Sequence, residues 1–310
     1  MIRNILEKLP RYGVAAFGFW LPAERRRRAE RFLRGWEQCS KLARADVVIV
    51  SYGKSGRTWV RVLISRFYQV VYGLSPKSLL GFDNLHRNNA AIPRIFLTHD
   101  NYIQDYSGNF DSKRDFYDKR VILLVRAPQD TAVSQYFQWK FRMRKRKKAL
   151  NEYPDHGAEV SPYDFATGQA GLPKIIDFMN LWARERERIR ELLIVRYEDL
   201  RADTAKEFAR IVRFLGGPER PDAIADAVQY ASVENMRQLE TKKIFWLAGG
   251  RMTARDQSNP DSFKVRRAKV GGYRDYFDDD EVERIDAYVR AKLSPIYGYG
   301  AEPGAGGGNA

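Results

Sequence analysis

Cysteine and histidine are both scarce in this 310-residue chain, and their scarcity narrows the chemistry that it can support. The single cysteine, Cys39, has no second cysteine with which to form an internal disulfide bond. The three histidines, His86, His99 and His156, lie too far apart in sequence to match the ligand spacing of a zinc site. We therefore predict a protein of a reducing compartment whose site holds no metal.

Long hydrophobic runs and targeting signals are lacking as well. The apolar stretch near the N-terminus, 12–21, is roughly half the ~20 residues that a membrane-spanning helix needs. No small-residue cleavage site of a secretory signal follows it. The sequence thus predicts a cytoplasmic protein.

Acidic residues are outnumbered, since 54 Lys and Arg face 39 Asp and Glu, for a net charge of +15. Two clusters supply much of the excess: Arg25 to Arg28, within a basic N-terminal helical segment (1–44), and the run KFRMRKRKK at 140–148. A solvated helix face is the ordinary interpretation of such a run. The first cluster, with the aromatic patch at 17–20, also fits an anchor on the inner face of an anionic membrane, and the second fits recruitment of an anionic glycan, glycolipid or membrane. The charge also leaves open a non-catalytic nucleic-acid-binding protein, although we expect no nucleic-acid partner.

Four short apolar runs predict buried parallel strands, at 47–50, 95–98, 121–125 and 192–195. Repeated strand–helix units with right-handed crossovers predict an α/β fold, a single P-loop-type domain with a central parallel sheet flanked by helices on both faces. We place this domain at 45–300 and expect the glycine-rich tail, 301–310, to be disordered.

Helical patterns follow three of these strands. The first covers 58–71, with its apolar residues on one stripe. The second begins at Pro128 and extends to about Trp139. The third is capped by Asp203 and stopped by Gly216 and Gly217.

A loop with the character of a phosphate-binding turn follows the first strand. The segment from Ser51 to Trp59 reads SYGKSGRTW, in which Gly53 and Gly56 let the backbone bend and Lys54 brings a mobile cation. Ligands of α/β sheets bind beyond the carboxyl ends of the strands, at the N-termini of the following helices. The segment therefore predicts an anion site, the alternative being a tight turn with an incidental lysine.

The Walker A pattern is absent from this loop, because Val48 stands where that pattern requires its first glycine. A P-loop nucleotide kinase, which would depend on ATP and magnesium, is therefore the second hypothesis.

The loop resembles the 5′-phosphosulfate loop of the sulfotransferases that use 3′-phosphoadenosine 5′-phosphosulfate (PAPS) and release 3′-phosphoadenosine 5′-phosphate (PAP). The family form is YPKSGTTW, and this chain reads YGKSGRTW. The resemblance implies that Trp59 stacks on adenine and that the phosphosulfate is contacted by Lys54, Ser55, Gly56, Arg57 and Thr58. The chain departs from the family at Gly53, where proline is common, and at Arg57, where threonine is usual.

A second segment, LLVRAPQDTAVSQYF at 123–137, resembles the family's 3′-phosphate motif, RxPxDxxxSxY. A forked guanidinium and a hydroxyl suit a phosphate, so Arg126 and Ser134 would hold the 3′-phosphate of PAPS. The alternative is that Arg126 pairs with Asp130 and fixes the turn.

Two further segments continue the resemblance, which runs from Val47 to Phe277. YEDL at 197–200 implies that Tyr197 lies near the adenine. FKVRRAKVGGYRDYF at 263–277 implies that Arg266 and Arg267 close over the 3′-phosphate.

Sulfuryl transfer requires a base for the acceptor and a cation for the leaving oxygen. PRIFLTHD at 93–100 resembles the family's PRxxKTH, whose histidine is the base, so His99 and Lys54 are the expected catalytic residues. Leu97 stands where many relatives carry a lysine, and Arg57 is a candidate to compensate. The alternative for His99 is a structural histidine held by Asp100.

The combined hypothesis is a PAPS-dependent sulfotransferase acting on a hydroxyl or amine. The sequence favours a carbohydrate or lipid acceptor over a small phenol, because the basic run at 140–148 interrupts the region expected near the acceptor. Tyr136, Phe137 and Trp139 either line the acceptor pocket or pack in the core.

Overall fold

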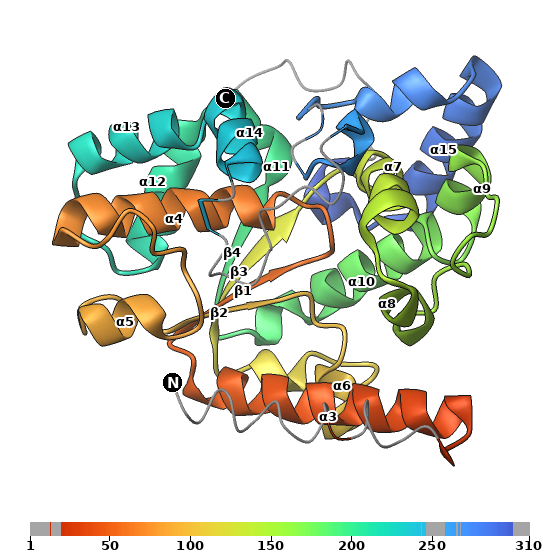
Figure 1. The fold of residues 1–310 in the computed structure, drawn as a ribbon, viewed down its shortest axis with the longest axis horizontal. Helices are drawn as coiled ribbons and strands as arrows, with labels where there is room; N and C mark the ends of the chain where they lie inside the picture. The colour runs from red at the N-terminus through yellow and green to blue at the C-terminus, as the bar shows by residue number, and fades with distance from the viewer. Residues whose placement is uncertain are drawn as a thin grey trace.

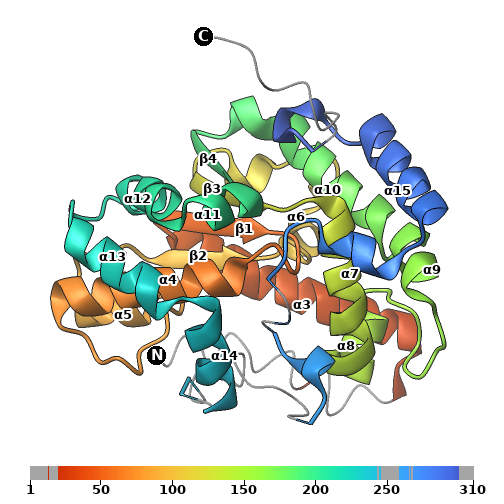
Figure 2. The ribbon, with the colours of Figure 1, turned by 90° about the horizontal axis from the view of Figure 1, so that it is seen from above.

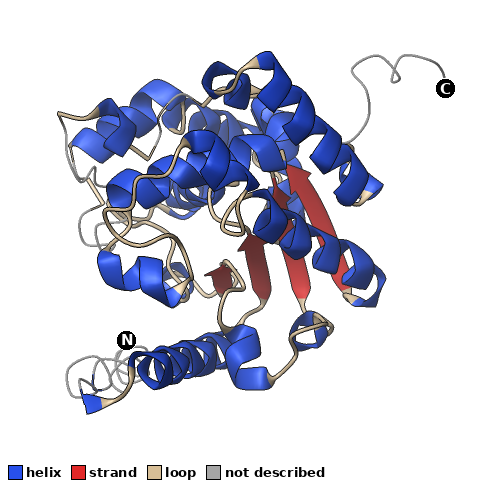
Figure 3. Cartoon of the chain, turned by 90° about the vertical axis from the view of Figure 1, so that its right-hand side faces the viewer, coloured by secondary structure: helices blue, strands red, loops and turns tan. Residues whose placement is uncertain are grey.

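A computed structural model describes residues 13, 20–242, 244–245, 258–264, 266 and 268–299 of the chain. At its centre is a sheet of four parallel strands in the order β2-β1-β3-β4, shown in red in Figure 3. The strands are β1 (Val47–Ser51), β2 (Ile95–Thr98), β3 (Arg120–Val125) and β4 (Glu191–Arg196). All four predicted strands and the predicted parallel sheet are therefore confirmed.

The strand register aligns the carboxyl ends of the strands. Val50 of β1 pairs with Thr98 of β2 and with Leu123 of β3, and Val125 of β3 pairs with Arg196 of β4. The residues that follow the strands therefore lie along one edge of the sheet.

One face of the sheet carries alternate aliphatic residues, including Val48, Val50 and Val121, because side chains alternate between the faces of a strand. They form a core with helices α7 (Pro128–Phe137), α10 (Leu172–Glu185) and α15 (Asp279–Lys292), which lie together on one side in Figures 1 and 2. Helices α3 (Ala23–Arg44) and α6 (Ile103–Ser107) also reach this core.

The opposite face carries the intervening residues Val47, Ile49 and Ile122. Six helices add to this second core: α4 (Arg57–Tyr72), α5 (Asn84–Asn88), α11 (Tyr197–Ala202), α12 (Thr204–Phe214), α13 (Pro221–Tyr230) and α14 (Val233–Thr241). Asp203 caps α12 by accepting a hydrogen bond of 3.0 Å from the Lys206 amide, as predicted. The prediction of helices on both faces is confirmed.

The predicted helix from Pro128 to Trp139 changes character at its end. α7 stops at Phe137, and a π-helical turn, Gln138–Arg142, continues it before α8 (Lys145–Leu150). A π turn adds a residue to the helical repeat and is frequent at functional sites. Here it places Arg142 on the wall of the central cavity.

The remaining short elements connect these layers. They are α9 (Pro162–Thr167) and the 3-10 helices Arg114–Phe116, Arg186–Arg188, Pro260–Ser262, Gly272–Tyr276 and Pro295–Tyr297.

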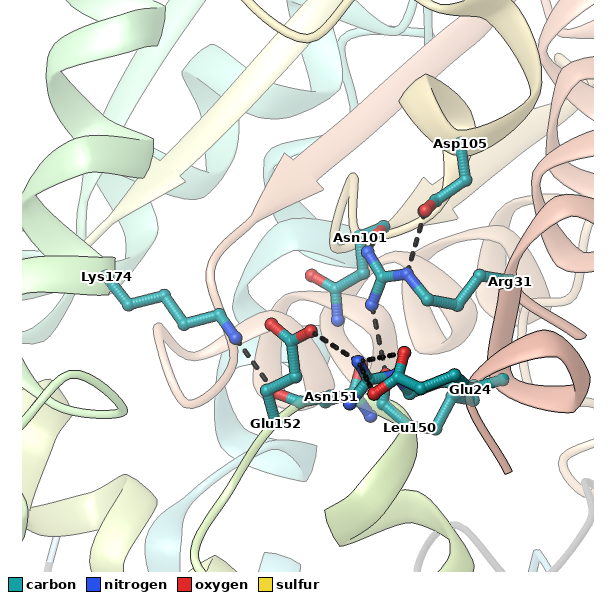
Figure 4. Close-up of polar contacts among 9 residues, drawn as sticks. Glu24, Arg31, Asn101, Asp105, Leu150, Asn151, Glu152 and Lys174 are labelled. Carbon is teal, nitrogen blue, oxygen red and sulfur yellow. Dashed lines mark hydrogen bonds and ion pairs between the residues drawn. The ribbon is translucent and has the colours of Figure 1, made fainter. Parts of the chain in front are cut away.

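Helix α3 packs closely on the loop before α6, and the two helices lie side by side in Figure 1. Gly35 allows this approach, since a Cβ there would stand 2.3 Å from the carbonyl oxygen of Tyr102. Arg31 fixes the contact, with hydrogen bonds from its guanidinium to Asp105 Oδ1 (2.8 Å) and to the carbonyl oxygens of Leu150 (3.0 Å) and Asn101 (3.3 Å), seen in Figure 4. Of the described helices, none has the length and apolar character needed to cross a membrane.

Candidate active site

A cavity of about 810 Å³ opens at the carboxyl edge of the sheet. Ten of the residues predicted from sequence line it: Lys54, Gly56, Arg57, Thr58, Trp59, His99, Arg126, Ser134, Tyr197 and Arg266. Ser55 is buried in the loop behind this lining, and Arg267 lies outside the described residues. The tertiary structure thus brings together residues from five separate segments of the chain.

The phosphate loop joins β1 to α4 through two left-handed residues. Lys54 has φ 76° and Gly56 has φ 86°, and Gly56 is the N-cap of α4. A side chain at Gly56 would place its Cβ 2.8 Å from Cδ2 of Tyr197, so glycine is required on both counts. Such a turn directs backbone amides and the positive end of the helix dipole toward one point, which is the geometry of an anion site.

Cations crowd around Lys54. Burial, followed by repulsion from Arg142 and Arg126, lowers the pKa of Lys54 to about 7. Burial also holds the pKa of Lys264 well below its usual range, with Lys54 and Arg142 as the next causes. A lysine whose pKa is lowered by burial and by neighbouring cations indicates a site suited to an anionic ligand, because an anion would offset the repulsion between the cations.

Sequence analysis did not select Arg142 or Lys264. Arg142 belongs to the basic run at 140–148, where only the π-helical turn distinguishes it from its neighbours. Lys264 stands two residues before Arg266 in a segment that was already matched to the family, so its position was an available signal.

Arg126 connects the phosphate loop with the segment after Arg266. Its Nη1 donates to the Lys54 carbonyl oxygen (3.4 Å) and its Nη2 to the Lys269 carbonyl oxygen (3.1 Å). The guanidinium also lies 4.4 Å above the Tyr197 ring and 3.4 Å from Asp130 Oδ2. Arg126 therefore does pair with Asp130, as the structural alternative proposed, and its side chain still lines the cavity.

Asp130 has a second task beside this ion pair. Its carboxylate accepts hydrogen bonds from the amides of Gly271 (2.9 Å) and Tyr273 (3.0 Å). Asp130, the aspartate of the predicted motif, therefore anchors the loop that contains Gly271 and Tyr273 next to the cavity.

Arg266, which precedes this loop in the chain, also lines the cavity. Its Cζ is 3.7 Å from the centroid of the Phe137 ring, and its guanidinium hydrogen-bonds the Tyr276 hydroxyl and lies 3.6 Å from Asp261 Oδ1. Phe137 itself lines the cavity.

The aromatic rings of Trp59 and Tyr197 line one end of the cavity. The Trp59 indole donates to the Ala231 carbonyl oxygen (2.9 Å), and its ring meets Tyr197 edge-on at 5.9 Å between centroids. Val233 lines the cavity beside them. This end offers flat apolar surfaces of the kind that receive a heterocyclic base.

His99 directly follows β2, the outer strand next to β1, on the same edge of the sheet. Its Nδ1 lies 2.8 Å from the Ser51 carbonyl oxygen, and its Nε2 lies 2.5 Å from Arg57 Nη2. Burial, then the Arg57 charge, holds the His99 pKa well below its usual range. Neither the burial of His99 nor its contact with Arg57 could be predicted from sequence, because both depend on the fold.

Asp100 does not hold His99. Its carboxylate pairs with Lys113 Nζ at 2.6 Å, and both side chains are buried. The structural alternative for His99 that rested on Asp100 is therefore wrong.

The third end of the cavity is polar. Asn101, Asn151, Tyr153 and Lys174 contribute to its lining, together with apolar Phe178. The Lys174 ammonium donates to the Asn151 carbonyl oxygen (2.8 Å), as Figure 4 shows, and burial lowers its pKa.

The aromatic residues after the second motif divide between the two roles considered for them. Tyr136 and Trp139 are buried and pack with Phe165 in a small core, whereas Phe137 lines the cavity.

The basic run is likewise not one solvated face. Arg144, Lys145, Arg146 and Lys147 are exposed, and Lys147 also lines the cavity. Lys148 is buried, with its Nζ 4.5 Å from the centroid of the Trp139 ring.

Within the described residues, no three or more histidine, cysteine, aspartate or glutamate side chains gather in an arrangement suited to a metal ion. The fold and the cavity thus define an α/β protein with a strand-to-helix loop that has the geometry of an anion site, a cationic cleft and a histidine beside the loop.

The family model described as "Sulfotransferase domain" matches residues 44–296, and the chain belongs to this family of sulfotransferase enzymes. Sulfotransferase 2A1 of Homo sapiens is 24% identical over 264 residues, covering 81% of this chain and 85% of the relative. Cytosolic sulfotransferase 15 of Arabidopsis thaliana is 24% identical over 330 residues, covering 94% of this chain and 84% of the relative.

Solved structures show the same fold. Mouse sulfotransferase SULT7A1 complexed with PAP superimposes with a TM-score of 0.54 at 20% identity, covering 80% of this chain and 84% of that one. Retinol dehydratase in complex with androsterone and the inactive cofactor PAP gives a TM-score of 0.53 at 17% identity, covering 80% of each chain.

Proposed function

We propose that this protein transfers a sulfuryl group from PAPS to a hydroxyl or amine of an acceptor. The observation that carries the proposal is the crowding of cations around the phosphate loop, where burial and the charges of Arg142 and Arg126 lower the pKa of Lys54 to about 7. A donor with a phosphosulfate and a separate 3′-phosphate matches such a charge better than a singly phosphorylated nucleotide. The PAP named in the structures of two relatives supports this donor.

The proposed donor contacts fall into three groups, one for adenine, one for the 3′-phosphate and one for the phosphosulfate. Trp59 and Tyr197 hold adenine between the phosphate loop and α14. Arg126, Ser134 and Arg266, with Arg267, hold the 3′-phosphate. The phosphosulfate lies on Lys54, Ser55, Gly56, Arg57 and Thr58.

In the proposed reaction the acceptor oxygen or nitrogen attacks sulfur in line with the departing phosphate oxygen. A bond from the acceptor atom to sulfur forms, while the bond from sulfur to the 5′-phosphate oxygen breaks and its electron pair leaves with PAP. His99 Nε2 takes the acceptor's proton, and the Lys54 ammonium neutralises the departing oxygen. The depressed pKa of His99 keeps the imidazole neutral, which is the form that accepts a proton.

For the acceptor, we favour a carbohydrate or the polar headgroup of a lipid. The cavity end beyond His99 combines amides and cations, including Asn101, Asn151 and Lys174. These groups satisfy the hydrogen bonds of a polyol better than those of a flat phenol, which buries apolar surface.

The proposal extends to a cytoplasmic enzyme that docks on the inner face of an anionic membrane. Trp20, Phe32 and Phe110 are 73%, 47% and 56% exposed, and Arg25 and Arg28 are exposed on α3. Phe110 also lines the cavity, so docking there would present the acceptor end to the lipid surface. Sedimentation with vesicles of neutral or anionic lipid tests this: we expect binding to anionic vesicles that Arg25→Glu with Arg28→Glu abolishes.

The donor assignment is tested by thermal stabilisation with PAP, compared with ATP plus magnesium and with duplex DNA. We expect a shift with PAP that exceeds both others. A larger shift with ATP and magnesium would favour the kinase hypothesis, and a larger one with DNA that vanishes in salt would favour nucleic-acid binding.

The base is tested by His99→Ala in a labelled-sulfate transfer assay, with cell extracts as the source of acceptor. We expect this variant to lose transfer and to keep PAP binding. Full transfer by the variant would exclude His99 as the base.

A further inference from the structure

The contact between Arg57 and His99 fixes the protonation of the imidazole. The Ser51 carbonyl oxygen can only accept a hydrogen bond, so Nδ1 of His99, 2.8 Å away, carries the ring hydrogen. Nε2 therefore holds the lone pair and accepts a hydrogen bond of 2.5 Å from Arg57 Nη2. The nitrogen that must receive a proton is occupied by a guanidinium.

A base in this state is inactive for two physical reasons. The lone pair of Nε2 is engaged by a donor that cannot give up its proton, because arginine stays charged throughout the accessible pH range. The charges that face His99 are also cationic: Arg57 first, then Lys147 and Lys264. An acceptor hydroxyl can reach Nε2 only after the guanidinium has moved.

Arg57 stands where the donor would displace it. It is the first residue of α4, directly after left-handed Gly56, at the positive end of the helix that borders the phosphate loop. A guanidinium forms paired, charge-assisted hydrogen bonds with a tetrahedral oxyanion, which are about twice as strong as bonds to a neutral acceptor. A phosphosulfate in the loop would therefore compete successfully with the neutral imidazole for Arg57.

Strand β2 supplies no cation that would compete with Arg57 for the donor. Leu97, whose position precedes His99 by two residues, lines the cavity with an apolar side chain. Among the cations that face His99, Arg57 is the one that contacts its Nε2 directly.

We propose that Arg57 is a catalytic residue that couples donor binding to release of the base. Without donor it caps His99 Nε2, and with PAPS bound it turns to the sulfuryl oxygens and stabilises their charge during transfer. His99 is then free to take the acceptor proton, so the enzyme acts on its acceptor only after the donor has bound. The inference rests on the proposed function, since it takes PAPS as the donor.

The test is a thermodynamic cycle that needs no acceptor. The chain has three histidines, so nitrogen NMR of 15N-histidine-labelled protein follows each ring, and His99→Gln assigns the His99 signals. The His99 pKa is measured in wild type and in Arg57→Ala, each alone, with saturating PAP and with saturating PAPS. The direct effect of the bound anion is read in Arg57→Ala and subtracted from the effect in wild type.

Two results are expected. The His99 pKa of the donor-free protein rises in Arg57→Ala, because the variant removes a cation and a hydrogen bond to the neutral form. The additional rise on going from PAP to PAPS is larger in wild type than in Arg57→Ala by about one pKa unit, a tenfold change in proton affinity. Equal increments in the two proteins would overturn the proposal.

Affinities give an independent readout. The preference for PAPS over PAP is expected to fall about tenfold or more in Arg57→Ala, and Arg57→Lys should recover part of it, because a lysine keeps the charge without the paired hydrogen bonds. An unchanged preference would contradict contact with the sulfuryl group. If neither PAP nor PAPS binds wild type, the proposed function itself fails, whereas normal binding without dependence on Arg57 removes only this inference.

Discussion

Lys113 Nζ lies 2.6 Å from Asp100 Oδ2, and the two side chains are 4% and 2% exposed. This pair ties the residue directly after His99 to the segment that precedes β3, and so it holds the position of the proposed base. Asp100 has φ 55°, a left-handed conformation that aspartate and asparagine tolerate better than most residues.

The first prediction concerns this pair. Lys113→Met leaves a buried carboxylate without its partner and should lower the free energy of unfolding by about 3–5 kcal/mol, measured by urea denaturation. Combining it with Asp100→Asn removes the uncompensated charge at a position where asparagine fits, so the double variant should regain part of the loss. A double variant no more stable than Lys113→Met would contradict this account.

The second prediction concerns the two left-handed glycines that bound α4. Gly56→Ala should destabilise the fold by about 1–3 kcal/mol and weaken PAP binding at least tenfold, because φ is 86° and the new Cβ meets Tyr197 at 2.8 Å. Gly73→Ala is the matched control, since φ is 61° there but no atom lies within 4 Å of the added Cβ. Calorimetric titration should find normal PAP affinity in the control; equal losses in both variants would separate PAP binding from the phosphate loop.

The third prediction is a pH dependence of donor binding. Lys54 has a pKa of about 7 in the free protein, and a bound anion favours its charged form, so its pKa rises on binding. Binding then takes up a proton, and PAP affinity should fall as pH rises from 7.5 to 9, by up to tenfold per unit. Phosphate groups, with a second pKa of about 6, are already ionised there.

Lys54→Arg provides the control for this titration, because arginine keeps its charge across the range. Isothermal calorimetry in buffers of different ionisation enthalpy should detect more proton uptake by wild type than by the variant, in which Lys264 still has a lowered pKa. The same pH slope in both proteins would exclude Lys54 as its source.

The fourth prediction separates the 3′-phosphate from the rest of the nucleotide. Arg126→Ala should reduce the preference for PAP over adenosine 5′-monophosphate by roughly 10- to 100-fold, since hydrogen bonds to a charged group contribute about 1.5–3 kcal/mol. Arg120→Ala, at the other end of β3, removes an exposed pair with Glu191 and should leave the preference unchanged. If Arg126→Ala weakens both nucleotides equally, Arg126 serves the loop and not the 3′-phosphate.

The sequence by itself determined the strands, the parallel sheet and the phosphate loop. These features follow from local patterns: aliphatic runs of four to six residues predict the strands, and glycines at a strand-to-helix turn predict the loop. Asp203 predicts a helix cap in the same way. Because parallel strands end on the same edge of a sheet, the sequence alone places the residues after 50, 98, 125 and 195 together.

Only the tertiary structure decided which partners these residues have. Asp100 is adjacent to His99 in sequence, yet it turns to Lys113, while Arg57, 42 positions away, contacts the imidazole. Sequence patterns report the direction of the chain and the average environment of a side chain. They do not report which distant side chain reaches a given nitrogen, because that depends on rotamers and on the packing of separate elements.

The charge distribution was decided in the same way. The run at 140–148 appears uniform in sequence, but a π-helical turn and α8 expose Arg144, bury Lys148 and direct Arg142 toward Lys54. Composition gave the sign of the charge, and the fold gave its location. The depressed pKa values of Lys54 and His99 follow from burial and from cations brought close by folding, which no local pattern encodes.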